Sequence, residues 1–180
     1  MIKTLGMMEF RSIAKGIEIA DVVLKAAEVE LVFCRTICPG KFMILISGEV
    51  GSVKEALDKG TNQSKGFLIG SFLLPNVHKD IIQSLKNKIK VVPNGAIGVV
   101  ETTNVVSGIF ILDKALKAAE VRLFKLSLGT LIGGKSYFII YGDVSSVQEA
   151  VKEALREIDE KKIVSSIVIP SPSKELISSL

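Results

Sequence analysis

The chain has 180 residues, of which 48% are hydrophobic and 23% charged. This composition excludes a disordered or collagen-like chain and fits one ordinary domain or two small ones. Mean hydropathy is high, at +0.43, but the longest charge-free stretch, residues 66–77, contains a Pro and is far shorter than the roughly 20 residues of a membrane-spanning helix. A net charge of +4 without a dense basic patch, and the absence of Trp, predict neither a nucleic-acid partner nor a membrane partner.

Hydrophobic periodicity and turn residues predict the same run of elements twice along the chain. Each run is strand, helix, strand, strand, helix, strand and a short terminal helix. The strands are predicted at residues 4–9, 30–35, 42–47 and 67–74, and again at 96–101, 122–127, 136–141 and 163–169. Such a βαββαβ unit is an α+β, ferredoxin-like sandwich, with helices on one face of a mostly antiparallel sheet.

The first helix of each run is predicted from apolar residues at helical spacing, with Ser12 and Asn104 as N-caps. Its buried stripe is expected to hold Ile13, Ile17, Ala20, Leu24 and Ala27 in the first run, and Val105, Ile109, Leu112, Leu116 and Ala119 in the second. The second helix of each run is expected to open with a capping box, at Ser52–Glu55 and Ser146–Glu149.

The two runs also match residue by residue. Lys25–Val29 returns letter for letter as Lys117–Val121, and Leu5–Glu9 is echoed by Ile97–Glu101, both at an offset of 92. Chance similarity does not hold register over about 80 residues, so the chain is a tandem duplication of one small domain. We predict a first domain over residues 1–90, a linker over 91–95 and a second domain over 96–180.

The repeated segments, together with Asp21 and with Gly48–Val50 followed by Ser52 and Val53, resemble bacterial microcompartment shell domains. The resemblance covers nearly the whole chain twice, in the unpermuted order of the family. It implies a homotrimer that imitates a hexamer and tiles, with other shell proteins, into the shell of a bacterial microcompartment in the cytoplasm. It also implies a structural protein, not an enzyme.

The resemblance places the loop after the second strand of each domain at a central pore, over Thr36–Lys41 and Leu128–Lys135. Besides Cys38, the pore-loop residues are then Thr36, Ile37, Pro39, Gly40 and Lys41 in the first copy, and Thr130, Leu131, Ile132, Gly133, Gly134 and Lys135 in the second. Lys25 and Lys117 correspond to the family's lysine at the edge between tiles, and His78 belongs to its edge motif. That motif is often Pro-Arg-Pro-His, whereas Pro75–His78 lacks the arginine.

The two cysteines invite different interpretations. Cys34 aligns with Leu126 on an apolar strand, so it is expected to be a small buried hydrophobe. Cys38 lies in a tight turn that should expose its thiol, and from the residues alone an ordinary loop cysteine is the plainer interpretation. Within the family, the propanediol-utilisation type carries a 4Fe–4S cluster in the trimer pore, ligated by one Cys-Pro-Gly cysteine per chain. That resemblance implies one cluster per trimer on Cys38, and an encapsulated redox enzyme as a further partner.

One segment, Gly129–Ser136, satisfies the P-loop pattern letter for letter. A P-loop must follow a strand and open a helix, whereas Lys135 and Ser136 lead into a predicted strand, so nucleotide hydrolysis is not expected. Glu9 and Glu101 are equivalent strand-end residues, for which a shared role in the fold is expected in preference to acid–base chemistry.

Two alternatives to a cluster-bearing shell protein stay open from the sequence. One is a tandem shell protein whose pore conducts metabolites and holds no cluster. The other, from a different class, is a small-ligand-binding regulator on the same ferredoxin-like topology.

Overall fold

A computed structural model of the protein describes residues 4–86 and 91–180. The two ends of the predicted first domain, residues 1–3 and 87–90, lie outside the described residues. The described chain forms two compact units, the first made of residues 4–77 with 129–134, and the second of residues 78–128 with 135–180. Each unit contains its own four-stranded sheet and its own helices.

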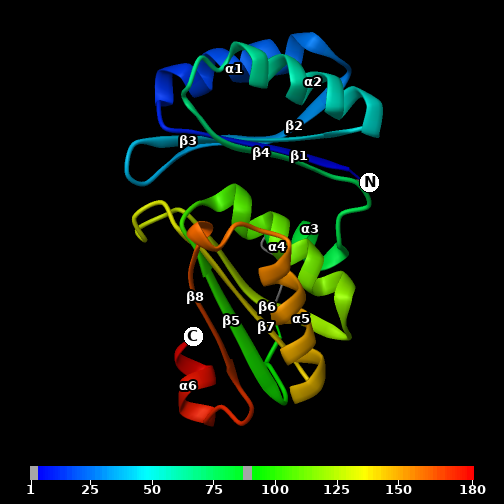
Figure 1. Cartoon of the computed structure of the whole chain (residues 1–180), viewed down its shortest axis with the longest axis vertical. Helices are drawn as coiled ribbons and strands as arrows, with labels where there is room; N and C mark the ends of the chain where they lie inside the picture. Colours follow the sequence, from blue (N-terminus) through cyan, green and yellow to red (C-terminus); the bar gives the residue numbers. More distant parts are fainter. Residues whose placement is uncertain (1–3, 87–90) are drawn as a thin grey trace. The chain divides into compact units, whose positions relative to one another are not determined.

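The first unit has the predicted βαββαβ order. Its elements are β1 (Leu5–Phe10), α1 (Ile13–Ala26), β2 (Val29–Ile37), β3 (Lys41–Gly48), α2 (Val50–Gln63) and β4 (Leu68–Leu74). The antiparallel strands lie in the order β2-β3-β1-β4, and α1 and α2 cover one face of the sheet (Figure 1). The loop that joins β2 to β3 therefore belongs to an edge hairpin.

The second unit repeats this architecture and adds short helices. Its elements are α3 (Lys79–Leu85), β5 (Ala96–Thr102), α4 (Val105–Ala118), β6 (Val121–Leu128), β7 (Ser136–Gly142), α5 (Val144–Arg156), a 3₁₀ turn (Glu160–Lys162), β8 (Ile163–Ile169) and α6 (Lys174–Ser179). The strand order is β6-β7-β5-β8, the same topology as in the first unit (Figure 1). The predicted fold class, two tandem ferredoxin-like domains in unpermuted order, is confirmed.

The duplication extends to the irregularities of the sheets. The pairing of β1 with β4 shifts register between Glu9 and Phe10, and the pairing of β5 with β8 shifts between Glu101 and Thr102, at equivalent positions. Bulges of this kind re-aim side chains and tend to be kept as designed features. The two acidic residues therefore lie beside the same irregularity in both copies.

The buried face of α1 differs from the prediction. Gly16, Ile19, Ala20 and Val23 are buried, whereas Ile13, Ile17 and Leu24 of the predicted stripe are 36%, 56% and 38% exposed. The prediction is wrong for these three residues, although Ala20 is buried as predicted, because α1 is apolar on two faces and periodicity cannot tell which of them faces the sheet. In the second copy, by contrast, Val105, Ile109, Leu112 and Leu116 of the stripe are all buried.

The two kinds of helix start give opposite outcomes. Ser12 and Asn104 cap α1 and α4 as predicted, because their side chains accept hydrogen bonds from the backbone N–H groups of Lys15 and Ser107. The predicted capping boxes are wrong, because α2 already begins at Val50 and α5 at Val144.

Packing explains the early start of the second helices. Val53 and Val147 are fully buried, each against a glycine of the central strand: a Cβ on Gly6 would lie 2.6 Å from Val53 Cγ1, and one on Gly98 would lie 2.8 Å from Val147 Cγ1. To bring this valine over the strand, the helix must already have begun, which places Ser52 inside its first turn.

A glycine of α1 provides a test of this tight helix-to-sheet packing. Gly16→Ala places a methyl group 2.6 Å from Phe42 Cβ and 2.5 Å from its ring, and we expect it to lower the free energy of unfolding by about 2 kcal/mol. Gly51→Ala in α2 meets no atom within 4 Å, and we expect it to raise stability by up to about 1 kcal/mol through helix propensity. Urea denaturation of both variants checks this; equal effects would contradict the packing.

Candidate functional site

The predicted pore loop of the first copy is a tight turn between β2 and β3. Ile37, the last residue of β2, is 4% exposed and anchors one side of the turn. Cys38, Pro39 and Gly40 form the turn itself, with a cis peptide bond before Pro39 and a φ of +76° at Gly40. Cys38 is partly buried and its thiol is free of any disulfide, so it is less exposed than predicted.

The predicted pore loop of the second copy is longer, and its residues 129–134 belong to the first compact unit. Gly129, Leu131, Gly133 and Gly134 all have φ between +60° and +74°. This backbone requires glycine at most of its positions. Leu131, the one non-glycine among them, is 91% exposed at the tip of the loop.

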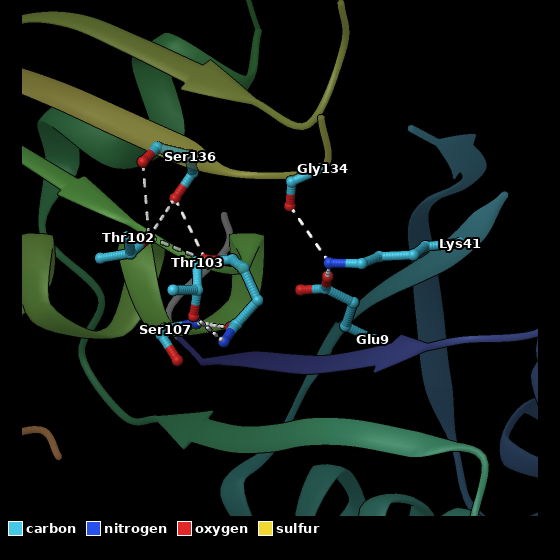
Figure 2. A network of polar contacts seen from close by, with 8 residues as sticks. Glu9, Lys41, Thr102, Thr103, Ser107, Gly134 and Ser136 are labelled. Carbon is cyan, nitrogen blue, oxygen red and sulfur yellow. Dashed lines mark hydrogen bonds and ion pairs between the residues drawn. The ribbon is translucent and has the colours of Figure 1, made fainter. Parts of the chain in front are cut away.

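The two loops are in direct contact. The backbone N–H of Cys38 donates to the carbonyl oxygen of Gly129 at 3.0 Å. The Lys41 ammonium donates to the carbonyl oxygen of Gly134 at 3.3 Å (Figure 2). The family resemblance places both loops at one pore, but no pattern in the sequence predicts these contacts, because they join segments about ninety residues apart.

Lys41 also forms an ion pair with a buried carboxylate. Its Nζ lies 3.0 Å from Glu9 Oε1, with Glu9 fully buried and Lys41 17% exposed (Figure 2). In the second copy Lys135 pairs with Glu101 at the same distance, but these side chains are 45% and 34% exposed. Because one ion pair is repeated at equivalent positions, Glu9 and Glu101 share a structural role, as expected.

The P-loop pattern does not form a phosphate site. Ser136, its last residue, begins β7 and not a helix. The Ser136 side chain is fully buried, and its Oγ lies 2.7 Å from Thr102 Oγ1 and 3.3 Å from the Asn104 carbonyl oxygen (Figure 2). A hydroxyl committed to the core in this way cannot ligate a magnesium ion in the loop.

The prediction for Cys34 is wrong, because this residue is exposed. It lies on β2, the edge strand, where the pairing with β3 shifts register between Leu31 and Phe33. An edge strand with a bulge turns part of its apolar side to solvent, which alignment with a leucine could not reveal. Within the described residues, no three His, Cys, Asp or Glu side chains form a metal-binding group.

His78 acts as a helix cap. Its ring Nδ1 accepts from the backbone N–H of Asp80, and its own backbone N–H donates to Asp113 Oδ1 at 2.8 Å. Burial lowers the pKa of His78 and outweighs the opposite effect of Asp80 and Asp113, so the ring is neutral near pH 7. His78 therefore has a structural role at the start of α3, and its place at the edge between tiles stays a prediction.

Asp80 is a buried anchor that sequence analysis missed. Its carboxylate accepts from Arg122 Nε at 2.8 Å and from the backbone N–H of Leu123 at 3.1 Å, and so fastens α3 to β6. Burial alone raises the pKa of Asp80, but these hydrogen bonds outweigh burial and lower it. The signal available in sequence was the single acidic residue in the first turn of a short helix.

The predicted edge lysines are both paired on their own helices. Lys25 bonds Asp21 at 2.6 Å, and Lys117 bonds Asp113 one turn earlier in α4. Lys25 is 74% exposed and Lys117 38%. Their role between tiles stays a prediction. Among residues 4–86 and 91–180, no helix is both long enough and apolar enough to cross a membrane.

Comparison with known families agrees with the duplicated fold. The BMC domain matches residues 4–77 and again residues 96–172. The chain therefore belongs to the BMC-domain family and carries that domain twice.

Among its relatives, the chain is similar to the bacterial microcompartment shell protein PduT of Citrobacter freundii, with 39% identity over 177 residues, 98% of this chain and 96% of the relative. The bacterial microcompartment shell protein PduA of Salmonella typhimurium is 33% identical over 81 residues, 44% of this chain and 86% of the relative. The crystal structure of a microcompartment protein from Desulfitobacterium hafniense is 36% identical, with a TM-score of 0.83 and 98% of both chains covered.

The lowered pKa of Asp80 predicts a pH dependence of stability. A carboxyl whose pKa is lower in the folded state stabilises the fold above its ordinary pKa, and this contribution is lost as the pH falls below about 4. We expect Asp80→Asn to lower the free energy of unfolding by about 2 kcal/mol at pH 7. Between pH 7 and pH 3, the stability of this variant is expected to fall less than that of the wild type. Glu175→Gln, at the equivalent but exposed position of α6, serves as the control. Equal acid profiles for the two variants, measured by urea denaturation between pH 3 and 7, would refute the anchor.

Proposed function

We propose that the protein is a structural tile of a bacterial microcompartment shell, that three chains form its ring, and that the ring carries an iron–sulfur cluster in its pore. The observation that carries the shell role is the presence of two BMC domains in one chain, at the full length of a relative named as a shell protein. Three chains of two domains place six equivalent domains around one axis.

The exposed face of α1 supports the ring. Ile13, Ile17 and Leu24 are exposed on α1, whereas their counterparts on α4 (Val105, Ile109 and Leu116) are at most 5% exposed. In a closed ring the two copies occupy equivalent positions, so a neighbouring chain would cover α1. The apolar side chains that a single chain leaves in water would then be buried.

Charge substitutions distinguish this face from other exposed apolar positions. Ile17→Glu is expected to shift the protein from trimer to monomer, because it buries a charge in the interface. Val50→Glu is the matched control: Val50 is 45% exposed, and its counterpart Val144 is also exposed, at 39%. Sedimentation velocity checks both variants, with circular dichroism to show that they are folded. A trimeric Ile17→Glu protein would place the interface elsewhere.

The cluster is proposed from the donor that the pore loop offers. One chain presents a single loop thiol, Cys38, and a cubane cluster usually takes four cysteines. A threefold axis multiplies Cys38 to three, which leaves one iron for a ligand that is not a cysteine. The second copy has no cysteine in its loop, so cysteine would alternate around the ring.

The Cys38 turn offers one ligand for such a cluster, a thiolate. The Lys41 ammonium is already paired with the buried Glu9 carboxylate and donates to Gly134, so its part here is to hold the turn. A cluster bound there supplies one-electron transfer, which would connect an encapsulated redox enzyme with a redox partner outside the shell.

Anaerobic reconstitution tests this function. The wild type and Cys34→Ala are expected to bind about four iron atoms per trimer, with broad visible absorbance. Cys38→Ala is expected to bind none while it stays trimeric. Equal iron in Cys38→Ala and Cys34→Ala would show that the iron is not held by Cys38. Iron-free wild type under these conditions would favour a pore that conducts metabolites.

A further inference from the structure

The loop of the second copy contacts both sides of the Cys38 peptide backbone. On one side, the Cys38 N–H donates to Gly129 O at 3.0 Å. On the other, the Cys38 carbonyl oxygen lies 1.9 Å from the place that a Cβ would take on Gly134. No residue other than glycine fits there, and the φ of +74° at Gly134 is itself a glycine conformation.

Gly134 also makes a hydrogen bond through its carbonyl group. Its carbonyl oxygen accepts from Lys41, which the buried carboxylate of Glu9 keeps in place at 3.0 Å (Figure 2). An ion pair shielded from water is screened less by salt than an exposed one. The corresponding pair Glu101–Lys135 is much more exposed, so the better-shielded pair belongs to the copy that carries Cys38.

We infer that residues 129–134 act as a brace that fixes the orientation of Cys38, with Gly134 and Lys41 as positioning residues. The second copy supplies no ligand of its own, and its loop is two residues longer than that of the first copy. The brace itself is a property of the folded chain, and only its consequence for a cluster rests on the proposed function.

Two neighbouring glycines allow a matched test. Gly133→Ala and Gly134→Ala both place alanine at a positive φ, of +65° and +74°. A Cβ on Gly133 meets no atom within 4 Å, whereas one on Gly134 collides with the Cys38 carbonyl. Both are made in the full chain with Cys34→Ser, which leaves Cys38 as the single thiol. The readout is the rate at which iodoacetamide alkylates Cys38 in the iron-free protein.

Gly134→Ala is expected to raise this rate about fivefold, because the turn loses a hydrogen-bonded support. Gly133→Ala is expected to stay within about twofold of the parent, since it breaks no contact. Equal rates for the two alanine variants would overturn the brace.

A second pair of variants keeps the test decisive if Gly134→Ala does not fold. Lys41→Met removes the donor to Gly134, and Lys135→Met removes the equivalent lysine of the second copy. Only Lys41→Met is expected to speed alkylation; equal rates would again overturn the brace.

The cluster gives an independent readout. If Cys38 binds iron, Gly134→Ala is expected to broaden the electron paramagnetic resonance signal of the reduced protein, and Gly133→Ala to leave it unchanged. If the parent binds no iron, the proposed function fails, while the alkylation rates still decide on the brace.

Discussion

The close approach of the second helix to the central strand sets the geometry of both units. Gly6 and Gly98 lack the side chain that would collide with Val53 and Val147. Dense packing of this kind leaves little freedom to slide one layer over another. It accounts for where α2 and α5 begin. In both sheets the strand order places β2 and β6 at an edge.

The loop of an edge hairpin can change in sequence and length more readily than the core of such a fold. The core tolerates few changes of volume, whereas a loop beyond an edge strand can change in length and chemistry. The first copy uses this freedom for a compact Cys-Pro-Gly turn, and the second for a longer loop with several left-handed residues. The proposed function therefore depends on two loops that the duplicated core holds without constraining their sequence.

Duplication also permits division of labour between equivalent positions. Glu9–Lys41 is buried and Glu101–Lys135 is half-exposed. Asp80 is buried against Arg122, whereas its counterpart Glu175 lies on the surface. A ring of identical domains would have to repeat every such contact six times. A tandem chain can place a ligand such as Cys38 in one copy and the loop that positions it in the other. Comparison of matched residues in the two copies shows where they differ.

The sequence by itself determined the duplication, the order of elements, the caps Ser12 and Asn104, and the interpretation of Gly129–Ser136 as a turn into a strand, because these depend on local propensity and on matches along one chain. Only the tertiary structure decided which face of α1 is buried, where α2 and α5 begin, that Cys34 is exposed, and that Asp80 and Gly134 are contact points. Each of these depends on how closely two segments distant in sequence approach, and no local pattern contains that distance.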